Sequence, residues 1–190
     1  MHMPNSVKQL NRDELETGLA QLASPKDDGV LDLIVCRPAI GQREVLATGI
    51  LDTREGLVGD NWATRGSSKT PDKTSHPEMQ VNVMNSRVIQ LIAQDRERWQ
   101  LAGDQLFIDL DLSDGNLPPG TRLSIGSAII EVTPMPHTGC AKFVERFGVD
   151  AMKFVNSQTG RALRLRGLNA RVVQPGTIRV GDAVRKIPAS

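Results

Sequence analysis

Short apolar segments rich in β-branched residues recur along this chain, and glycine or proline separates most of them from their neighbours. Examples are VLDLIVC (30–36), MQVNVMN (79–85) and QLFIDLDLS (105–113). Runs of this length and composition predict short strands. Because many short strands combined with few helices are typical of barrels, we expect a mainly β (α+β) fold, a β-barrel with a few helices packed around it.

Two later segments share one pattern that strengthens this expectation. PGTRLSIGSAII (119–130) and PGTIRVGDAV (175–184) both run from Pro-Gly-Thr through a short strand and a Gly turn into a second strand. We interpret the pattern as hairpin geometry used twice, with Gly126 and Gly181 at the tight turns, and not as a true internal repeat.

The helical segments and the division of the chain follow from caps, breakers and composition. Apolar residues at helical spacing predict helices in the segments 11–25, 86–103 and 140–156. A long polar loop, 61–78, is of a length that is commonly functional or disordered. No linker-like segment divides the remainder. We therefore expect residues 1–29 to form an N-terminal helical extension and residues 30–187 to form one domain.

Charge and aromatic content restrict the function classes. The 190 residues carry a net charge of +1, and only 3% are aromatic, so neither a whole-protein field nor stacking platforms favour nucleic acid or a membrane as partner. The distribution is uneven, because residues 137–171 hold seven basic and two acidic side chains, whereas residues 95–115 hold six acidic and two basic ones. This local polarity suits a small anionic ligand.

The expected environment is a reducing one. The only two cysteines, Cys36 and Cys140, lie far apart and form no CxxC motif. No apolar run is long enough to span a membrane, and the first residues lack the apolar core of a signal peptide. We expect a soluble cytoplasmic protein.

Cys140 lies in the most unusual stretch, TPMPHTGCAKF (133–143), where an apolar strand ends and a helix is expected to begin. A helix start together with Lys142 and Arg146 creates positive potential, which favours a thiolate that can attack electrophiles or bind soft metals. A structural cysteine packed under the helix start remains open on spacing alone. Cys36, inside an apolar strand, is read as a small buried hydrophobe.

His137 suggests two kinds of site, and neither is supported by the rest of the sequence. A zinc site with Cys140 lacks further ligands at paired spacing. A cysteine hydrolase dyad matches no local protease signature. We expect His137 to orient a ligand or to cap the turn, and His76 to be a residue of the polar loop that could still line a cleft.

The basic run GRALRLRGLNARVV (160–173) is the second functional signal. On a strand, Arg164 and Arg166 would share one face and could present a fork of donors to a phosphate. A solvated surface strand explains the same pattern. No P-loop, no dinucleotide-binding glycine motif and no lysine context suggesting pyridoxal phosphate is recognised.

Taken together, these segments resemble a stand-alone, bacterial-type MOSC domain, the module named from the C-terminal part of molybdenum cofactor sulfurases. The resemblance covers about residues 30–187. The segments that carry it are GLVGDNWATRG (56–66), HPEMQVNVMNSR (76–87), DGNLPPGTRLSIGSAIIEVT (114–133), HTGCAKFVERFG (137–148) and RGLNARVVQPGTIRVGD (166–182). The cysteine block and the closing hairpin are its most specific parts.

The resemblance implies a β-barrel-like fold and a molybdenum cofactor, the Mo-pyranopterin. The family's cysteine, which maps to Cys140, either ligates molybdenum or carries sulfur as a persulfide. His137 is placed with Cys140 at the catalytic centre. The residues that we expect to bind the cofactor are Thr138, Lys142, Arg161, Arg164, Arg166, Asn169, Arg65, Asn82, Asn85 and Arg87.

Three functions follow as hypotheses. The first is a molybdenum-dependent reductase of N-hydroxylated small molecules with Cys140 as metal ligand, which needs electrons from a ferredoxin or flavin partner because the chain has no such module. The second is a sulfur carrier that is loaded on Cys140 by a pyridoxal-phosphate-dependent cysteine desulfurase and serves metal–sulfur cluster or cofactor sulfuration. The third is an anion- or cofactor-binding module without chemistry of its own.

Overall fold

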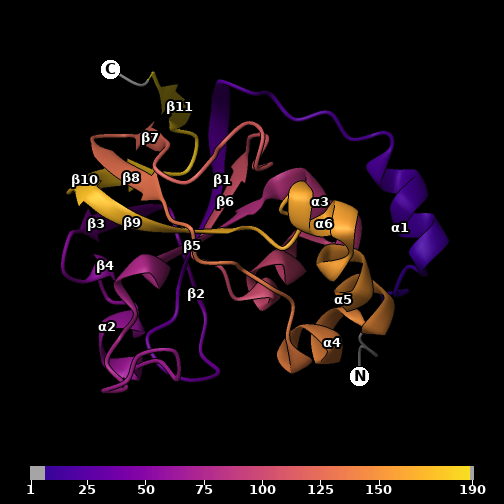
Figure 1. Cartoon of the computed structure of the whole chain (residues 1–190), viewed down its shortest axis with the longest axis horizontal. Helices are drawn as coiled ribbons and strands as arrows, with labels where there is room; N and C mark the ends of the chain where they lie inside the picture. Colours follow the sequence, from indigo (N-terminus) through magenta and orange to yellow (C-terminus); the bar gives the residue numbers. More distant parts are fainter. Residues whose placement is uncertain (1–6, 189–190) are drawn as a thin grey trace.

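The computed structural model describes residues 7–188, and its strands form a barrel with helices gathered mainly on one side (Figure 1). Strand β1 (Asp28–Cys36) belongs to a sheet with the order β11-β7-β8-β9-β5-β6-β1-β2. The other strands of this sheet are β2 (Glu44–Leu46), β5 (Val81–Asn85), β6 (Leu106–Asp109), β7 (Arg122–Ile125), β8 (Ala128–Val132), β9 (Leu168–Gln174) and β11 (Ala183–Ile187).

Strand β1 also pairs with β11, and this pairing closes seven of the strands into a barrel. The β5–β6 pair is parallel, whereas the remaining pairs in the closed ring are antiparallel. A smaller sheet is formed by β10 (Gly176–Arg179), β3 (Thr48–Asp52) and β4 (Gly56–Leu57). The expected β-barrel with accompanying helices is thus confirmed.

Of the two predicted hairpins, one is confirmed and one is wrong. β7 and β8 pair directly around Gly126, whose φ of 55° suits glycine. By contrast, β10 pairs with β3, and β11 pairs with β7 and β1. Gly181, with a φ of 96°, therefore lies at a bend where the chain leaves one sheet for another. The two sequences look alike because a tight glycine turn serves both purposes.

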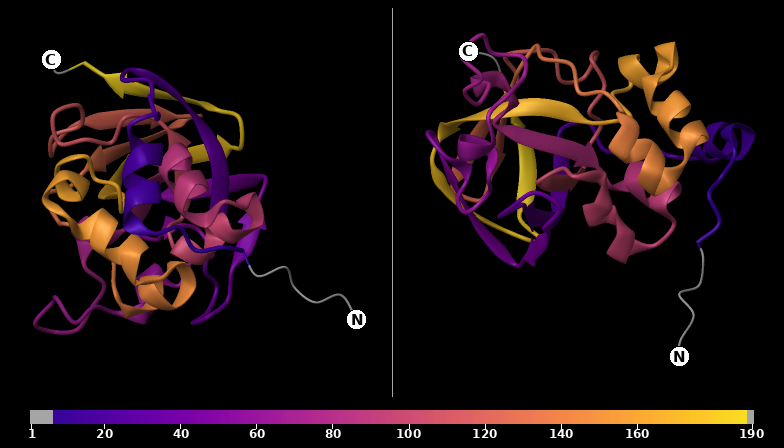
Figure 2. Two further views of the ribbon diagram at one scale, coloured as in Figure 1. Left: turned by 90° about the vertical axis from the view of Figure 1, so that its right-hand side faces the viewer. Right: turned by 90° about the horizontal axis from the view of Figure 1, so that it is seen from below.

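Alternation of side chains along the strands produces two cores. In β8 the residues Ala128, Ile130 and Val132 are buried and the residues between them are partly exposed. They join a barrel core that includes Leu31, Leu106 and Leu123. A second core lies between the barrel and the helices, and its largest members include Met84, Trp99, Phe107, Phe143 and Phe147. The right-hand view of Figure 2 shows the ring of strands beside the helical layer.

The helical layer contains α1 (Arg12–Leu19), α3 (Ser86–Ala93), α4 (Ala141–Phe147), α5 (Val149–Asn156) and α6 (Gln158–Ala162). The predicted single helix over 86–103 is wrong. Gln94 ends α3 in the left-handed conformation, with a φ of 60°, and a 3-10 helix, η2 (Arg96–Ala102), follows. The break lets Trp99 join the same core that α3 covers.

The expected N-terminal helix is present as α1, and Asn11 caps it together with Glu14 in a capping box. This helix packs on α3 and α5, and its residue Leu15 is buried. The division of the chain at residue 30 remains a prediction, and residues 1–6 of the expected extension lie outside the described part. The polar loop 61–78 contains the short helix α2 (Trp62–Arg65) and the start of a 3-10 helix, η1 (Pro77–Met79).

Candidate functional site

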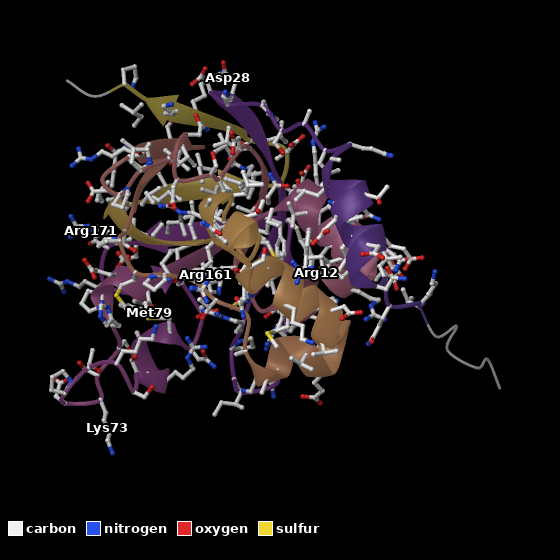
Figure 3. All side chains as sticks on the ribbon, turned by 45° about the vertical axis from the view of Figure 1, so that its right-hand side comes forward. Arg12, Asp28, Lys73, Met79, Arg161 and Arg171 are labelled. Atoms are coloured by element: carbon white, nitrogen blue, oxygen red, sulfur yellow. The ribbon has the colours of Figure 1, made fainter. Side chains whose placement is uncertain are left out.

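The segment between β8 and α4, residues 133–140, separates two clefts in the region where the barrel meets the helices. The first, which we call the cysteine cleft, has a volume of about 240 Å³ and is lined by residues that include Arg37, Arg43, Arg65, His137, Cys140 and Arg146. The second, the Arg161 cleft, has a volume of about 360 Å³ and includes Met135, His137, Thr138, Arg161 and Leu168. Met79, which also lines the cysteine cleft, and Arg161 are labelled in Figure 3.

Cys140 is the N-cap residue of α4, and its side chain is exposed to solvent. Buried Phe143 and Phe147 anchor the helix that follows. The residue before the cysteine is held by Asn156 of α5, because the Gly139 N–H donates to Asn156 Oδ1 at 2.9 Å and the amide of Asn156 donates back to the Gly139 carbonyl at 3.0 Å. The expected helix start at this cysteine is confirmed.

Arg37, at the end of β1, is buried in a network that sequence reasoning did not predict. Its guanidinium donates to both carboxylate oxygens of Asp60, at 2.8 and 2.9 Å, and to Asn82 Oδ1 at 3.0 Å. The side chain of Asp60 has no exposure and that of Arg37 only 5%. Asp60 thereby compensates the charge of Arg37, which lines the cysteine cleft as a largely neutralised group.

Asn82 and Asn169, both expected to bind the cofactor, extend this network. The Asn82 amide donates to Asn169 Oδ1 at 2.6 Å, and the Asn169 amide donates to the Met135 carbonyl at 3.0 Å. Asn82 lines the cysteine cleft, whereas Asn169 is fully buried and lines neither cleft. The contacts of Asn169 give it a role in holding the segment 133–140 in place.

Arg166 is buried and forms an ion pair with fully buried Asp104, with 2.6 Å between Nη1 and Oδ2. The other carboxylate oxygen of Asp104 lies 3.4 Å from His137 Nδ1. Burial, followed by the nearby charges of Arg166 and Arg37, lowers the pKa of His137 well below its ordinary value. His137 is therefore neutral near pH 7, and its ring lines both clefts.

Four cations of the cysteine cleft have no carboxylate partner in residues 7–188, namely Arg43, Arg65, Lys142 and Arg146. A Cβ added to Gly103 would lie 3.6 Å from Arg43 and 3.8 Å from Arg146, so both guanidinium groups flank this glycine. Burial lowers the pKa of Arg43, and the charge of Arg146 lowers it further. Such uncompensated like charges are an electrostatic cost that a bound anion would remove.

Sequence reasoning found some of these residues and missed others. Arg65 and Lys142 were expected near the site and line the cysteine cleft. Arg146 was recognised only as a source of positive potential. Arg37, Arg43 and Asp104 were missed, because nothing in their neighbouring residues marks them and each reaches the site only through tertiary folding.

The predicted fork of Arg164 and Arg166 is not formed. The chain makes turns over residues 163–166 before β9 begins, and Arg164 adopts a φ of 48°. Arg164 binds Asp114 at 2.7 Å and lines the Arg161 cleft, whereas Arg166 is paired with buried Asp104 and lines the cysteine cleft. Thr138 and Arg161 also line the Arg161 cleft.

Two further expected cofactor residues lie elsewhere. Asn85 caps α3 by accepting from the Val88 N–H at 2.9 Å and donates to the Leu110 carbonyl. Arg87 forms a bidentate ion pair with Asp109, with both contacts at 2.7 Å. Neither residue lines the cysteine cleft or the Arg161 cleft. His76 likewise lines neither, and its Nδ1 accepts from the Glu78 N–H at 3.2 Å.

No group of three or more His, Cys, Asp or Glu side chains within residues 7–188 is arranged to hold a metal ion. None of the helices in the described part of the chain has the length and apolar character needed to cross a membrane.

Known structures resemble this fold at low sequence identity. The YuaD protein from Bacillus subtilis has a TM-score of 0.65 and 13% identity, over 86% of this chain and 97% of its own. YiiM from Escherichia coli has a TM-score of 0.55 and 18% identity, over 85% and 71%. YiiM from Geobacillus stearothermophilus has a TM-score of 0.52 and 13% identity, over 87% and 76%. At this identity the likeness establishes the fold alone.

Sequence comparison gives the family. No curated protein shows significant sequence similarity to this chain. The model of the MOSC domain matches residues 70–185, which are more than half of the chain and include His137 and Cys140. The chain belongs to the MOSC domain family.

Proposed function

We propose that this protein binds an anionic molybdenum cofactor in the cysteine cleft and reduces N-hydroxylated small molecules. The observation that carries the proposal is the position of an exposed thiol, Cys140, in a cleft with four uncompensated cations. A thiolate is a ligand that soft metal centres prefer, and guanidinium groups bind phosphate in a bidentate manner.

The residues present fit such a cofactor. No Asp or Glu of the described residues lines the cysteine cleft, so no carboxylate in its wall faces a bound anion. Arg43 also keeps a buried Nε without a hydrogen-bond partner. In this proposal Cys140 holds the metal, while Arg43, Arg65 and Arg146 hold the anionic groups of the cofactor. When bound, the cofactor supplies two-electron redox chemistry at molybdenum.

The overall reaction balances with two electrons and two protons: R–NH–OH gives R–NH₂ and one water. The N–O bond breaks, the nitrogen is reduced, and the oxygen leaves as water. We propose that a ferredoxin or flavin protein is the electron donor, and that the substrate is a small molecule bound beside the cofactor.

The test compares wild type with Cys140→Ala, both produced in a host that makes the molybdenum cofactor. We expect wild type to contain molybdenum and to reduce an amidoxime with a chemically reduced viologen as electron donor, and Cys140→Ala to have lost both properties. Cys36→Ala is the matched control, because Cys36 is buried and lies outside both clefts. Normal molybdenum content and activity in Cys140→Ala would refute the proposal.

A second candidate, the sulfur carrier, is favoured by the exposure of Cys140, because a partner protein must reach a persulfide sulfur to remove it. Incubation with a cysteine desulfurase and cysteine should then add one sulfur atom to Cys140, removable by cyanide and detected by mass spectrometry. Failure to form this adduct under conditions that load a known carrier would exclude the role. If Cys140→Ser leaves binding of the cofactor and any phenotype intact, the non-catalytic binding module is the better description.

A further inference from the structure

His137 and Asp104 face each other through two atoms that have no other partner. Asp104 Oδ2 accepts from Arg166 at 2.6 Å, which leaves Oδ1 as the free oxygen of a fully buried carboxylate. This oxygen lies 3.4 Å from His137 Nδ1. Both atoms are sealed from solvent, and neither forms a hydrogen bond within residues 7–188. The two atoms are close enough for a small rotation of the imidazole to join them.

This arrangement selects one tautomer of the imidazole. Burial raises the pKa of Asp104, and the charge of Arg166 and its hydrogen bond oppose this shift. With Arg166 as its ion-pair partner we take the carboxyl group as ionised, in which case Oδ1 can only accept a hydrogen bond. A proton on Nδ1 satisfies this oxygen, whereas a lone pair on Nδ1 would face a carboxylate lone pair in a buried setting. The favoured state therefore carries the ring proton on Nδ1.

The opposite ring nitrogen is then an acceptor. The positive charges around the ring, those of Arg166, Arg37 and Lys69, oppose a second proton, and burial acts in the same direction. Nε2 forms no hydrogen bond with any described residue, and unlike Nδ1 it is not sealed from solvent. The His137 ring lines both clefts, so its open edge is available to a ligand bound in them.

The Arg161 cleft beside this edge differs in character from the cysteine cleft. Its walls include Pro134, Met135, Pro136, Val155 and Leu168. Its one acidic lining residue, Asp114, is paired with Arg164. Its remaining polar side chains include His137, Thr138 and Arg161, and apolar walls with a few placed polar groups are typical of sites for small organic molecules.

We propose that the Arg161 cleft is the substrate compartment and that His137 Nε2 accepts a hydrogen bond from an O–H or N–H donor of the substrate. The proposal rests on the proposed function and names its substrate class: a small molecule with an apolar body whose N–OH group reaches His137. Asp104 is the positioning residue that fixes the tautomer. A carboxylate at the same place would meet the Nε2 lone pair and be rejected.

The tautomer is tested by ¹⁵N NMR of histidine-labelled, cofactor-free protein at pH 7. We expect the His137 spectrum of an Nδ1–H imidazole. His76 is an internal control with the opposite expectation, because its Nδ1 accepts from the Glu78 N–H and its proton must lie on Nε2. In Asp104→Asn, His137 should move toward the Nε2–H form. If Asp104→Asn does not fold, the wild-type spectrum alone decides. An Nε2–H or doubly protonated His137 in wild type would overturn the assignment.

The substrate class is tested by titrating the same labelled protein with benzaldoxime and with its O-methyl ether, which has lost the only donor. We expect benzaldoxime to shift His137 Nε2 and to bind about tenfold more tightly than the ether, the value of one hydrogen bond. His137→Phe should bind both compounds equally. Equal binding of the two by wild type, or no change at His137 with either, would overturn the proposal.

Both experiments use protein without cofactor, so their outcome is separate from that of the molybdenum analysis. If the protein binds molybdenum normally but His137 shows neither the expected tautomer nor the expected response to benzaldoxime, only this inference is refuted. The reverse outcome would leave a binding cleft for N-hydroxylated molecules in a protein that uses Cys140 differently.

Discussion

The Asn82 amide lies 2.6 Å from Asn169 Oδ1, although the two residues are 87 positions apart. Together they connect Arg37, which follows β1, to the Met135 carbonyl in the segment that precedes Cys140. The segment 133–140 is therefore held by buried amide side chains of the barrel, and its position depends on β5, β9 and the end of β1 together.

Substitution of Asn169 should loosen this segment. Asn169→Leu leaves the Asn82 amide and the Met135 carbonyl without their partners, which should cost about 1–3 kcal/mol for each buried group. Urea unfolding measures the loss, and hydrogen exchange over residues 135–141 should become faster. Gln174→Leu, an exposed position on the same strand, is the control and should have little effect. Unchanged exchange in Asn169→Leu would contradict this role.

The lowered pKa of His137 gives stability a defined dependence on pH. Below the ordinary histidine pKa of about 6.5, the unfolded chain binds a proton at this histidine that the folded chain does not bind. The free energy of unfolding therefore decreases as the pH is lowered below this value. The slope from this one group is at most about 1.4 kcal/mol per pH unit. Full stability is retained above this pKa.

Comparison with His137→Gln tests this contribution, because the variant lacks the imidazole and keeps the other titrating groups, Asp104 included. Denaturant unfolding between pH 7 and pH 5 should show a steeper loss for wild type than for the variant. Parallel curves would show that His137 takes up its proton as readily in the folded state as in the unfolded one.

The two cysteines should differ sharply in reactivity. Cys140 is exposed, whereas Cys36 is 4% exposed and burial raises the pKa of its thiol. Iodoacetamide should therefore add one carbamidomethyl group to native protein, at Cys140, and a second only after unfolding. Intact mass followed by peptide mapping measures this. Early labelling of Cys36 would contradict the burial described above.

Removal of one uncompensated cation should separate anion binding from stability. Arg43→Gln relieves repulsion with Arg146, so the cofactor-free protein should be as stable as wild type or more stable, in contrast to most substitutions. Binding of inorganic phosphate, measured by calorimetry, should weaken several-fold and depend less on salt. Lys153→Gln, an exposed position on α5, is the control. Unchanged phosphate binding would remove Arg43 from the anion site.

Local signals predicted much of this molecule. The β7–β8 hairpin, the Asn11 cap and the helix that starts at Cys140 each follow from neighbouring residues, whose conformational preferences need no distant partner. The resemblance to MOSC domains then predicted a β-barrel-like fold and a functional role for Cys140.

The wrong or incomplete predictions concern partners distant in sequence. Arg166 seemed to belong with Arg164, yet its partner is Asp104, 62 positions away. Likewise, a Gly turn at 181 gave no sign that β10 and β11 belong to different sheets. Charge pairing and strand pairing over such distances are decided by burial in the finished fold, which local spacing does not encode.

Strand β1 carries β2 and β11 along one edge, and β6 along the other. The barrel is thus sealed by its first strand and its last, so it cannot be completed during synthesis until β11 has left the ribosome. Until then the unpaired N–H and C=O groups of β1 and β7 are open to strands of other chains. Pairing with residues 183–187 therefore covers edges of β1 and β7 that would otherwise be free to pair with other chains.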